Sequence, residues 1–202
     1  MTVSLEDVKK LREETQAKII ECKKALEETN GDLREAKKIL RKKGLEIAEK
    51  KSGIQTNQGI ITSYIHHDGR MGTLVEIHCQ SDFVARNQDF VDFCRNVAMH
   101  IAAFSPDWIS PRDVPETAIK EEEFVLRAQA ENEKKPEHIV EKIIEGRLKK
   151  FYDRHCLLNQ IFLKEEDKTV QNVLQELIAR LGENIKIHRF IRYELEASSG
   201  EN

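Results

Sequence analysis

The segment GIITSYIHHDGRMGTLVEIHC, residues 59–79, most constrains how this chain can fold. It contains two runs rich in β-forming residues, 59–65 and 71–78, on either side of an Asp-Gly dipeptide. Asp-Gly between alternating apolar segments is the usual signal of an antiparallel β-hairpin. Because most of the remaining chain has helical periodicity, this hairpin predicts an α+β fold.

Residues 1–52 are predicted to form a small three-helix module. The first helix begins at Ser4, which forms a capping-box-like start with Asp7 three residues later. The third helix follows an Asn-Gly-Asp turn at residues 30–32, whose aspartate is a ready N-cap, and we expect it to end at Gly44. A core of this size is only marginally stable on its own.

The second helix of this module, about 17–28, carries a candidate partner surface. The residues expected on one face are Ile19, Cys22 and Leu26. Ile19 and Ile20 are adjacent, so one of them must face away from a three-helix core. Lys23 lies four residues after Ile19, and exposed apolar residues beside a cation commonly rim a partner site. The alternative is that both isoleucines belong to the core.

The remaining residues, 53–202, are predicted to form a core domain in which a small antiparallel sheet packs with helices. After the hairpin, a helix is expected over about 87–104 and a helical hairpin over about 116–152. A closing helix and strand follow over 169–195. Arg189 interrupts the apolar face of that strand, so we expect the aliphatic stem of its side chain to be buried and its guanidinium group to reach an edge of the sheet. The apolar residues of this face are Ile185, Ile187, Ile191, Tyr193 and Leu195.

The distribution of charge argues against direct binding of nucleic acid. The net charge is −3 and 34% of residues are charged, with both signs mixed, so the chain has no overall basic field. Residues 37–51 contain seven Lys or Arg against two Glu, but no aromatic residue lies among them. We interpret this stretch as a solvated helix end.

Cysteine usage and hydropathy predict a cytoplasmic protein. The four cysteines form no C-x-x-C pair and fit buried thiols in a reducing compartment. The N-terminal segment MTVSLEDVKK lacks an apolar stretch, and no run approaches membrane-spanning length. We therefore expect a soluble chain with no membrane partner.

The sequence contains no recognisable motif for catalysis or cofactor binding. Nucleotide-binding glycine loops, H-E-x-x-H and G-x-S-x-G are all missing from it. His66 and His67 lie in the hairpin turn, where neighbouring residues point to opposite sides, so they make a weak metal pair. His155 and Cys156 make a weak dyad, because sequence neighbours rarely share the required geometry. We predict no catalytic residue, no metal site and no cofactor, and favour a protein that binds another protein.

A second candidate partner surface is the junction CQSDFVARN, residues 79–87, between the hairpin and the next helix. Phe83 is either a core aromatic, as most phenylalanines are, or a ring presented to a partner. Asp82 also has two interpretations, because it can cap the following helix or act on a partner.

Several motifs along essentially the whole chain resemble the elongation factor Ts family. LREETQAKIIECKKALEETNGD, residues 11–32, is similar to the N-terminal signature of that family, and SDFVARN, residues 81–87, is similar to its second signature. Three further segments follow in the same order: KPEHIVEKIIEGRLKKFY, LLNQIFLKEEDKTV and LGENIKIHRFIRYEL. The length resembles that of short bacterial-type members.

The resemblance implies a guanine nucleotide exchange factor that binds elongation factor Tu, a GTPase, and promotes GDP release. It also implies that the N-terminal module is similar to a ubiquitin-associated domain and touches the nucleotide-binding domain of the GTPase. Asp82 and Phe83, followed by Val84, match the residues that the family presents near the magnesium and phosphate region of its partner. The residues that match the family's contacts on the N-terminal module are Arg12, Ile19, Ile20 and Lys23.

The chain departs from the family pattern at Gln16 and Lys18, where glycines are usual. These changes affect how closely the start of the second helix approaches a partner. A rival interpretation is an adaptor that binds through residues 1–52 alone. The sequence leaves the oligomeric state open, and the final strand and residues 157–163 are candidates for a homodimer interface.

Overall fold

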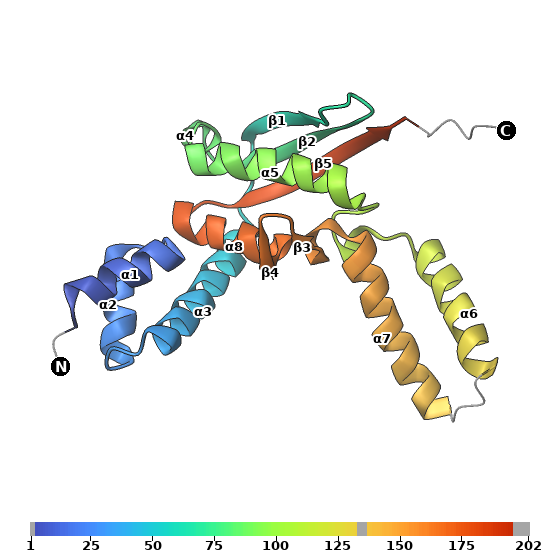
Figure 1. Cartoon of the computed structure of the whole chain (residues 1–202), viewed down its shortest axis with the longest axis horizontal. Coiled ribbons are helices and arrows are strands. Elements are labelled where there is room, and N and C mark those ends of the chain that lie inside the picture. The colour runs from blue at the N-terminus through green and yellow to red at the C-terminus, as the bar shows by residue number, and fades with distance from the viewer. Residues whose placement is uncertain (1–2, 133–136, 196–202) are drawn as a thin grey trace. The chain divides into compact units, whose positions relative to one another are not determined.

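The computed structural model describes residues 3–132 and 137–195, and Figure 1 shows the elements in chain order. The chain divides into two compact units. Unit 1 comprises Met1–Ile61, Glu76–Cys94 and Asn172–His188, and unit 2 comprises Thr62–Val75, Arg95–Gln171 and Arg189–Asn202. The domain boundary placed at residue 52 stays a prediction.

The N-terminal module consists of α1 (Leu5–Thr15), α2 (Ile19–Glu28) and α3 (Leu33–Lys51). The Ser4 Oγ accepts a hydrogen bond from the backbone N–H of Glu6 (3.1 Å) and so caps α1. The three helices share one hydrophobic cluster, which explains why three short amphipathic helices are stable together. Its buried members are Val8, Leu11, Cys22, Ala25, Leu26, Ala36 and Leu40.

Helix α3 does not end at Gly44, so that prediction is wrong. Its N-cap is Asp32, as predicted, whose Oδ1 accepts from the N–H groups of Arg34 and Glu35 (2.8 and 3.1 Å). The helix continues to Lys51 because Leu40 and Ala48, on either side of Gly44, are both buried. A β-carbon added at Gly44 would lie 3.4 Å from the Cβ of Ala179, so the glycine allows a close helix approach.

The hairpin and the helices of the core lie where they were expected. Strands β1 (Gln58–Ile65) and β2 (Met71–Cys79) are joined by a turn in which Gly69 has φ +67°, as an Asp-Gly hairpin requires. Strand β5 (Ile185–Glu194) completes a three-stranded sheet in the order β1-β2-β5. The α+β class is therefore confirmed. The other helices are α4 (Asp82–Ala85), α5 (Gln88–Phe104), α6 (Glu116–Asn132), α7 (Glu137–His155) and α8 (Val170–Leu181).

Two features of unit 2 bear on the sequence interpretation. Helices α6 and α7 form the predicted helical hairpin, with Leu126, Val140 and Ile144 buried between them. A small antiparallel pair, β3 (Ile161–Phe162) and β4 (Glu165–Thr169), was missed. It was missed because the second strand reads EEDKT and has no apolar alternation.

The predicted face of the last strand is only half right. Ile185 and Ile187 are buried, but the apolar residues at 191, 193 and 195 are exposed. Arg189, taken as a whole residue, is exposed. Beyond Ile187 the half-buried positions are 190 and 192, and Arg192 Nε donates to the Ala102 carbonyl (3.1 Å).

We predict that Gly59→Ala destabilises the chain by about 2–4 kcal/mol, because it combines backbone strain with overpacking. Gly59 has φ +155°, and a β-carbon there would lie 2.2 Å from the backbone oxygen of Ile77. Urea denaturation measures the change. The matched control is Gly53→Ala, where a β-carbon meets no atom within 4 Å. Equal unfolding midpoints for the two variants would contradict the close approach described for β1.

Candidate partner-binding site

The turn that carries Phe83 is a single helical turn, α4, directly after β2. Ser81 is its N-cap, and its Oγ accepts from the N–H of Val84 (3.3 Å). The interpretation of Asp82 as the cap is therefore wrong, because Asp82 is the first residue inside the helix. Its carboxylate lies 3.5 Å from an Arg86 nitrogen, and both side chains are more than half exposed, so this pair adds little stability.

A carboxylate from a distant part of unit 1 holds this turn. Glu183 accepts two hydrogen bonds from Ser81, one from its N–H (3.1 Å) and one from its Oγ (2.8 Å). Gly182, with φ +75°, ends α8 immediately before it. A charged acceptor that takes two bonds from one residue fixes both the position and the orientation of that residue. Sequence reasoning missed Glu183, because its partner Ser81 lies 102 residues away in the chain.

Burial and the nearby Glu183 carboxylate raise the pKa of Cys79 to about 11. The thiol is therefore protonated at neutral pH. It donates to the Ser81 carbonyl oxygen (3.2 Å), which adds a further hydrogen bond to the same capping residue.

The residue after Glu183 anchors a different segment. Asn184 is buried, and its Nδ2 donates to the carbonyl oxygens of Ser52 (3.3 Å) and Ile54 (2.7 Å). Two consecutive side chains thus connect the end of α8 to the Phe83 turn and to the chain that leaves α3. Within unit 1, these contacts join segments that are more than 100 residues apart.

The side chains of the Phe83 turn divide sharply between surface and interior. Phe83 is 83% exposed, so the core-aromatic interpretation is wrong. Val84 is only 8% exposed, so in the free chain it anchors the turn rather than presenting a surface. Its role as a partner contact stays a prediction. An exposed phenylalanine on a helical turn held by hydrogen bonds is the arrangement expected of a ring that meets a partner.

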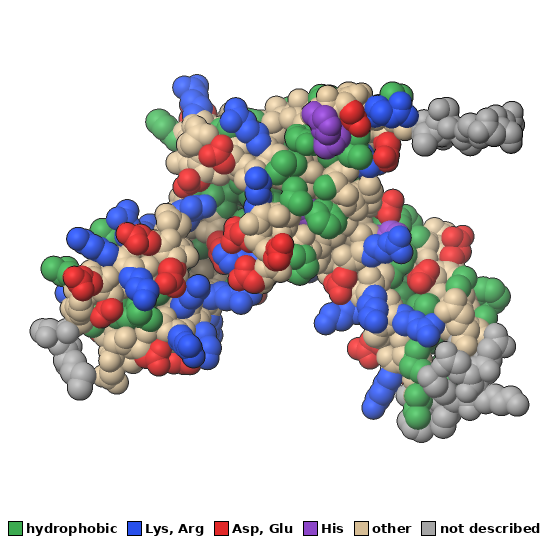
Figure 2. All heavy atoms as spheres, in the orientation of Figure 1, with side chains coloured by type: hydrophobic (Ala, Val, Ile, Leu, Met, Phe, Trp, Pro, Cys, Tyr) green, Lys and Arg blue, Asp and Glu red, His purple; other side chains and the backbone are tan. Residues whose placement is uncertain are grey.

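The residues predicted on the N-terminal module are all at its surface. Ile19 is 54% and Ile20 is 67% exposed, so neither belongs to the core, and the expectation that Ile19 shares a buried face with Cys22 is wrong. Ile19 is the first residue of α2, and Ala17 packs against the core before it. Arg12 and Lys23 are also exposed, and the Lys23 Nζ lies 3.8 Å from a carboxylate oxygen of Glu27. Figure 2 shows charges of both signs over these helices, with hydrophobic side chains appearing between them.

The backbone explains one of the two departures from the family pattern. Gln16 ends α1 with φ +54°, in the left-handed region that favours glycine, and its Nε2 donates to the Glu13 carbonyl (2.9 Å). Lys18 has an extended backbone, φ −62° and ψ 139°, which any residue adopts. A glycine therefore has a conformational advantage at position 16 but not at position 18.

The weak dyad His155 and Cys156 has no catalytic geometry. Cys156 is fully buried, and burial together with the carboxylates of Asp113 and Asp107 raises its pKa to about 11. The Nδ1 of His155 lies 2.6 Å from Asp107 Oδ2, so the imidazole is engaged elsewhere. A thiol that stays protonated at neutral pH is a poor nucleophile.

In the portion of the chain that is described, no helix has both the length and the apolar character needed to cross a membrane.

Comparison with known proteins places the motifs in context. A family model described as "Elongation factor TS" matches residues 2–197. The chain is 55% identical over 192 residues to elongation factor Ts of Acetivibrio thermocellus, covering 95% of this chain and 89% of that protein. It is 51% identical over 193 residues to elongation factor Ts of Moorella thermoacetica, covering 96% of this chain and 95% of that protein.

We predict that Glu183→Ala destabilises the chain by about 1–3 kcal/mol, because it leaves the Ser81 N–H without its acceptor. Urea denaturation of the full chain measures the change. Glu46→Ala, at an exposed position of α3, is the matched control and is expected to shift stability by less than about 0.5 kcal/mol. If the two variants unfolded alike, the hydrogen bonds of Glu183 would not hold the turn.

We also predict that Gln16→Gly stabilises the chain by about 1 kcal/mol, because it removes the cost of a left-handed backbone at a residue with a β-carbon. The melting temperature in calorimetry reports this change. Lys18→Gly is the control and is expected to lower the melting temperature, because glycine there only adds freedom to the unfolded chain. A lower melting temperature for Gln16→Gly would contradict the conformational explanation.

Proposed function

Because the chain belongs to the elongation factor Ts family and acts in translation elongation, we propose that it is a guanine nucleotide exchange factor for elongation factor Tu. In this role it binds the GTPase and accelerates release of GDP, without making or breaking a covalent bond. Its place of action is the cytoplasm.

The observation that carries this proposal is the exposed ring of Phe83 on a turn held by Ser81 and Glu183. A rigid aromatic side chain loses little conformational entropy when it enters a partner, so most of its buried area contributes to binding. The buried Val84 anchors the turn that carries the ring. These properties favour a ring that inserts between packed elements of the GTPase.

The mechanism follows from thermodynamic linkage. A factor releases GDP only by binding the nucleotide-free GTPase more tightly than the GDP-bound form, and the coupling is reciprocal. Each ~1.4 kcal/mol of coupling weakens nucleotide binding about tenfold. We propose that Phe83 displaces side chains that support the magnesium coordination of the GTPase. Metal sites depend on the residues that hydrogen-bond to the metal ligands and orient them. Asp82 is exposed and does not cap α4, which supports the proposal that it acts on the partner by charge or hydrogen bonding.

The N-terminal module supplies a second contact in this proposal. Ile19 and Ile20 offer exposed apolar area, while Arg12 and Lys23 offer cations beside it. Apolar residues rimmed by charge are typical of a non-obligate protein interface. Separate contacts at the module and at the Phe83 turn would let the factor hold the GTPase while the ring acts on it. A homodimer stays a prediction.

We predict that Phe83→Ala lowers the rate of factor-dependent GDP release at least about tenfold, since a central aromatic in an interface commonly contributes this much. Release of labelled GDP from elongation factor Tu, with and without the chain, measures the rate. The unfolding free energy should change by less than about 0.5 kcal/mol, because Phe83 is 83% exposed.

The matched control is Phe124→Ala, which removes a 76% exposed ring from α6 in unit 2. It should leave the release rate unchanged. A wild-type chain that does not accelerate GDP release would overturn the proposed function. Normal release by Phe83→Ala would overturn the role of the ring alone.

A further inference from the structure

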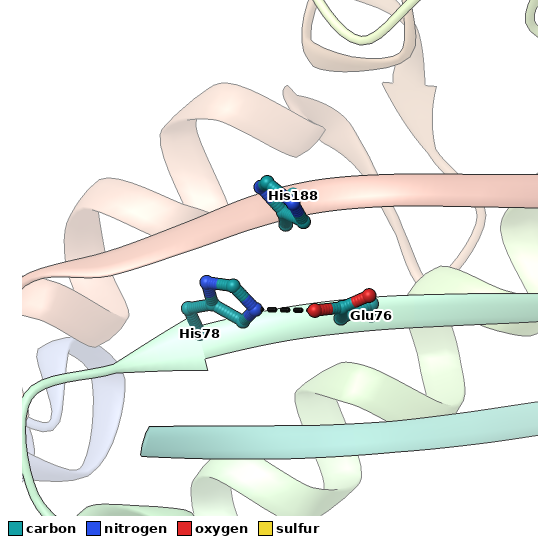
Figure 3. Close-up of side chains that lie close together, drawn as sticks. All are labelled: Glu76, His78 and His188. Atoms are coloured by element: carbon teal, nitrogen blue, oxygen red, sulfur yellow. Dashed lines mark hydrogen bonds and ion pairs between the residues drawn. The ribbon is translucent and has the colours of Figure 1, made fainter. Parts of the chain in front are cut away.

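Three potential metal ligands come together on one side of the sheet. Glu76 and His78 are two residues apart on β2, so their side chains point to the same side, and His188 comes from β5. His78 Nε2 lies 2.6 Å from Glu76 Oε1, and the rings of His78 and His188 stack with centroids 4.5 Å apart. One ligand atom from each residue lies within 4.8 Å of the other two. Figure 3 shows the three side chains, with the His78 ring directed at Glu76.

We propose that Glu76, His78 and His188 form a binding site for a divalent transition metal, Zn²⁺. Two imidazoles and one carboxylate are ligands that Zn²⁺ accepts, and three protein ligands leave a fourth position for water. Within the described part of the chain, this is the one group of His, Cys, Asp and Glu side chains close enough to hold a metal ion.

The distances require only small side-chain movements. Tetrahedral ligands at 2.0–2.1 Å from zinc lie about 3.3 Å from each other. The His78–Glu76 pair therefore opens by less than 1 Å when the metal replaces the shared proton. His188 must close by up to about 1.5 Å to reach the same spacing. It is exposed, so its ring can turn towards the ion without repacking the core.

The surroundings leave room for the fourth ligand. Glu76 and His78 line a depression of about 260 Å³. Its other lining residues are 57–61, which lead into β1 and form its first part. Water can reach an ion at these side chains from that depression. Lys186 lies on the same side of β5 as His188, but it is exposed and can keep its ammonium group in water.

This site could not be predicted from the sequence, because His188 lies 110 residues after His78 and only the sheet brings them together. The sequence alone singles out a different pair, His66 and His67, whose ring centroids lie 4.3 Å apart. Among the described residues, this pair does not belong to any group of three potential metal ligands. That pair therefore serves as a control for adventitious binding by surface histidines.

A bound ion would connect β2 to β5 through side chains. Because a metal that binds only the folded state stabilises it by mass action, the melting temperature should rise with zinc concentration. This readout does not depend on exchange activity. The metal site and the proposed exchange function can therefore fail independently, since none of its three ligands is a predicted contact of the GTPase.

The experiment titrates Zn²⁺ into the full chain, prepared without a histidine tag, in competition with a chromophoric chelator. We expect one equivalent to bind the wild-type chain. His188→Gln should weaken that binding at least about tenfold, since even residues that only support a ligand change affinity by 10–100-fold. His67→Gln should bind as the wild type does. Zinc should raise the melting temperature of the wild type and of His67→Gln, but not that of His188→Gln.

Cobalt substitution identifies the ligands. Co²⁺ should give the intense visible absorption of a four- or five-coordinate site without a thiolate charge-transfer band. Equal zinc affinity of the wild type and His188→Gln would overturn the site, and so would a thiolate band, because it would assign the metal to a cysteine. Circular dichroism checks that His188→Gln is folded. If it is not, Glu76→Gln replaces it in the same comparison with the same expected loss.

Discussion

The Phe83 turn depends on the pair of hydrogen bonds between Ser81 and Glu183. Helix α4 has only four residues, too few to be stable through its own backbone bonds. The carboxylate of Glu183 accepts from both the N–H and the Oγ of Ser81, and the Cys79 thiol donates to the carbonyl of the same residue. These contacts define where the helix begins. The direction of the Phe83 side chain follows from that starting point.

The same region shows how one short stretch serves stability and recognition together. Val84 is buried and Phe83 is exposed, although they are neighbours in one turn. The buried Val84 anchors the backbone of the turn, while the neighbouring Phe83 ring stays exposed. The exposed isoleucines at the start of α2 follow a similar rule, because Cys22, Ala25 and Leu26 already fill the buried face of that helix.

Local patterns predicted most of the elements but few of the contacts between them. The Asp-Gly hairpin, the N-cap at Asp32 and the helical hairpin were predictable because each depends on residues close in sequence. The predictions for Gly44 and for the apolar face at Ile191, Tyr193 and Leu195 failed because packing against a distant segment decided the local conformation. Glu183 was not predictable for the same reason, since its partner lies 102 residues away. The exposure of Phe83 rested on the family resemblance, because the residue pattern alone allowed a core position.

The adjacency of Glu183 and Asn184 has a consequence for how the family can vary in length. Surface connections usually accept insertions and deletions, because their side chains make few specific contacts. Here two successive residues bind in two different directions, to Ser81 and to the backbone at Ser52 and Ile54. A single added or lost residue between α8 and β5 would break at least one of these attachments. This short connection should therefore keep a constant length among relatives, while the longer connections of the chain vary in length.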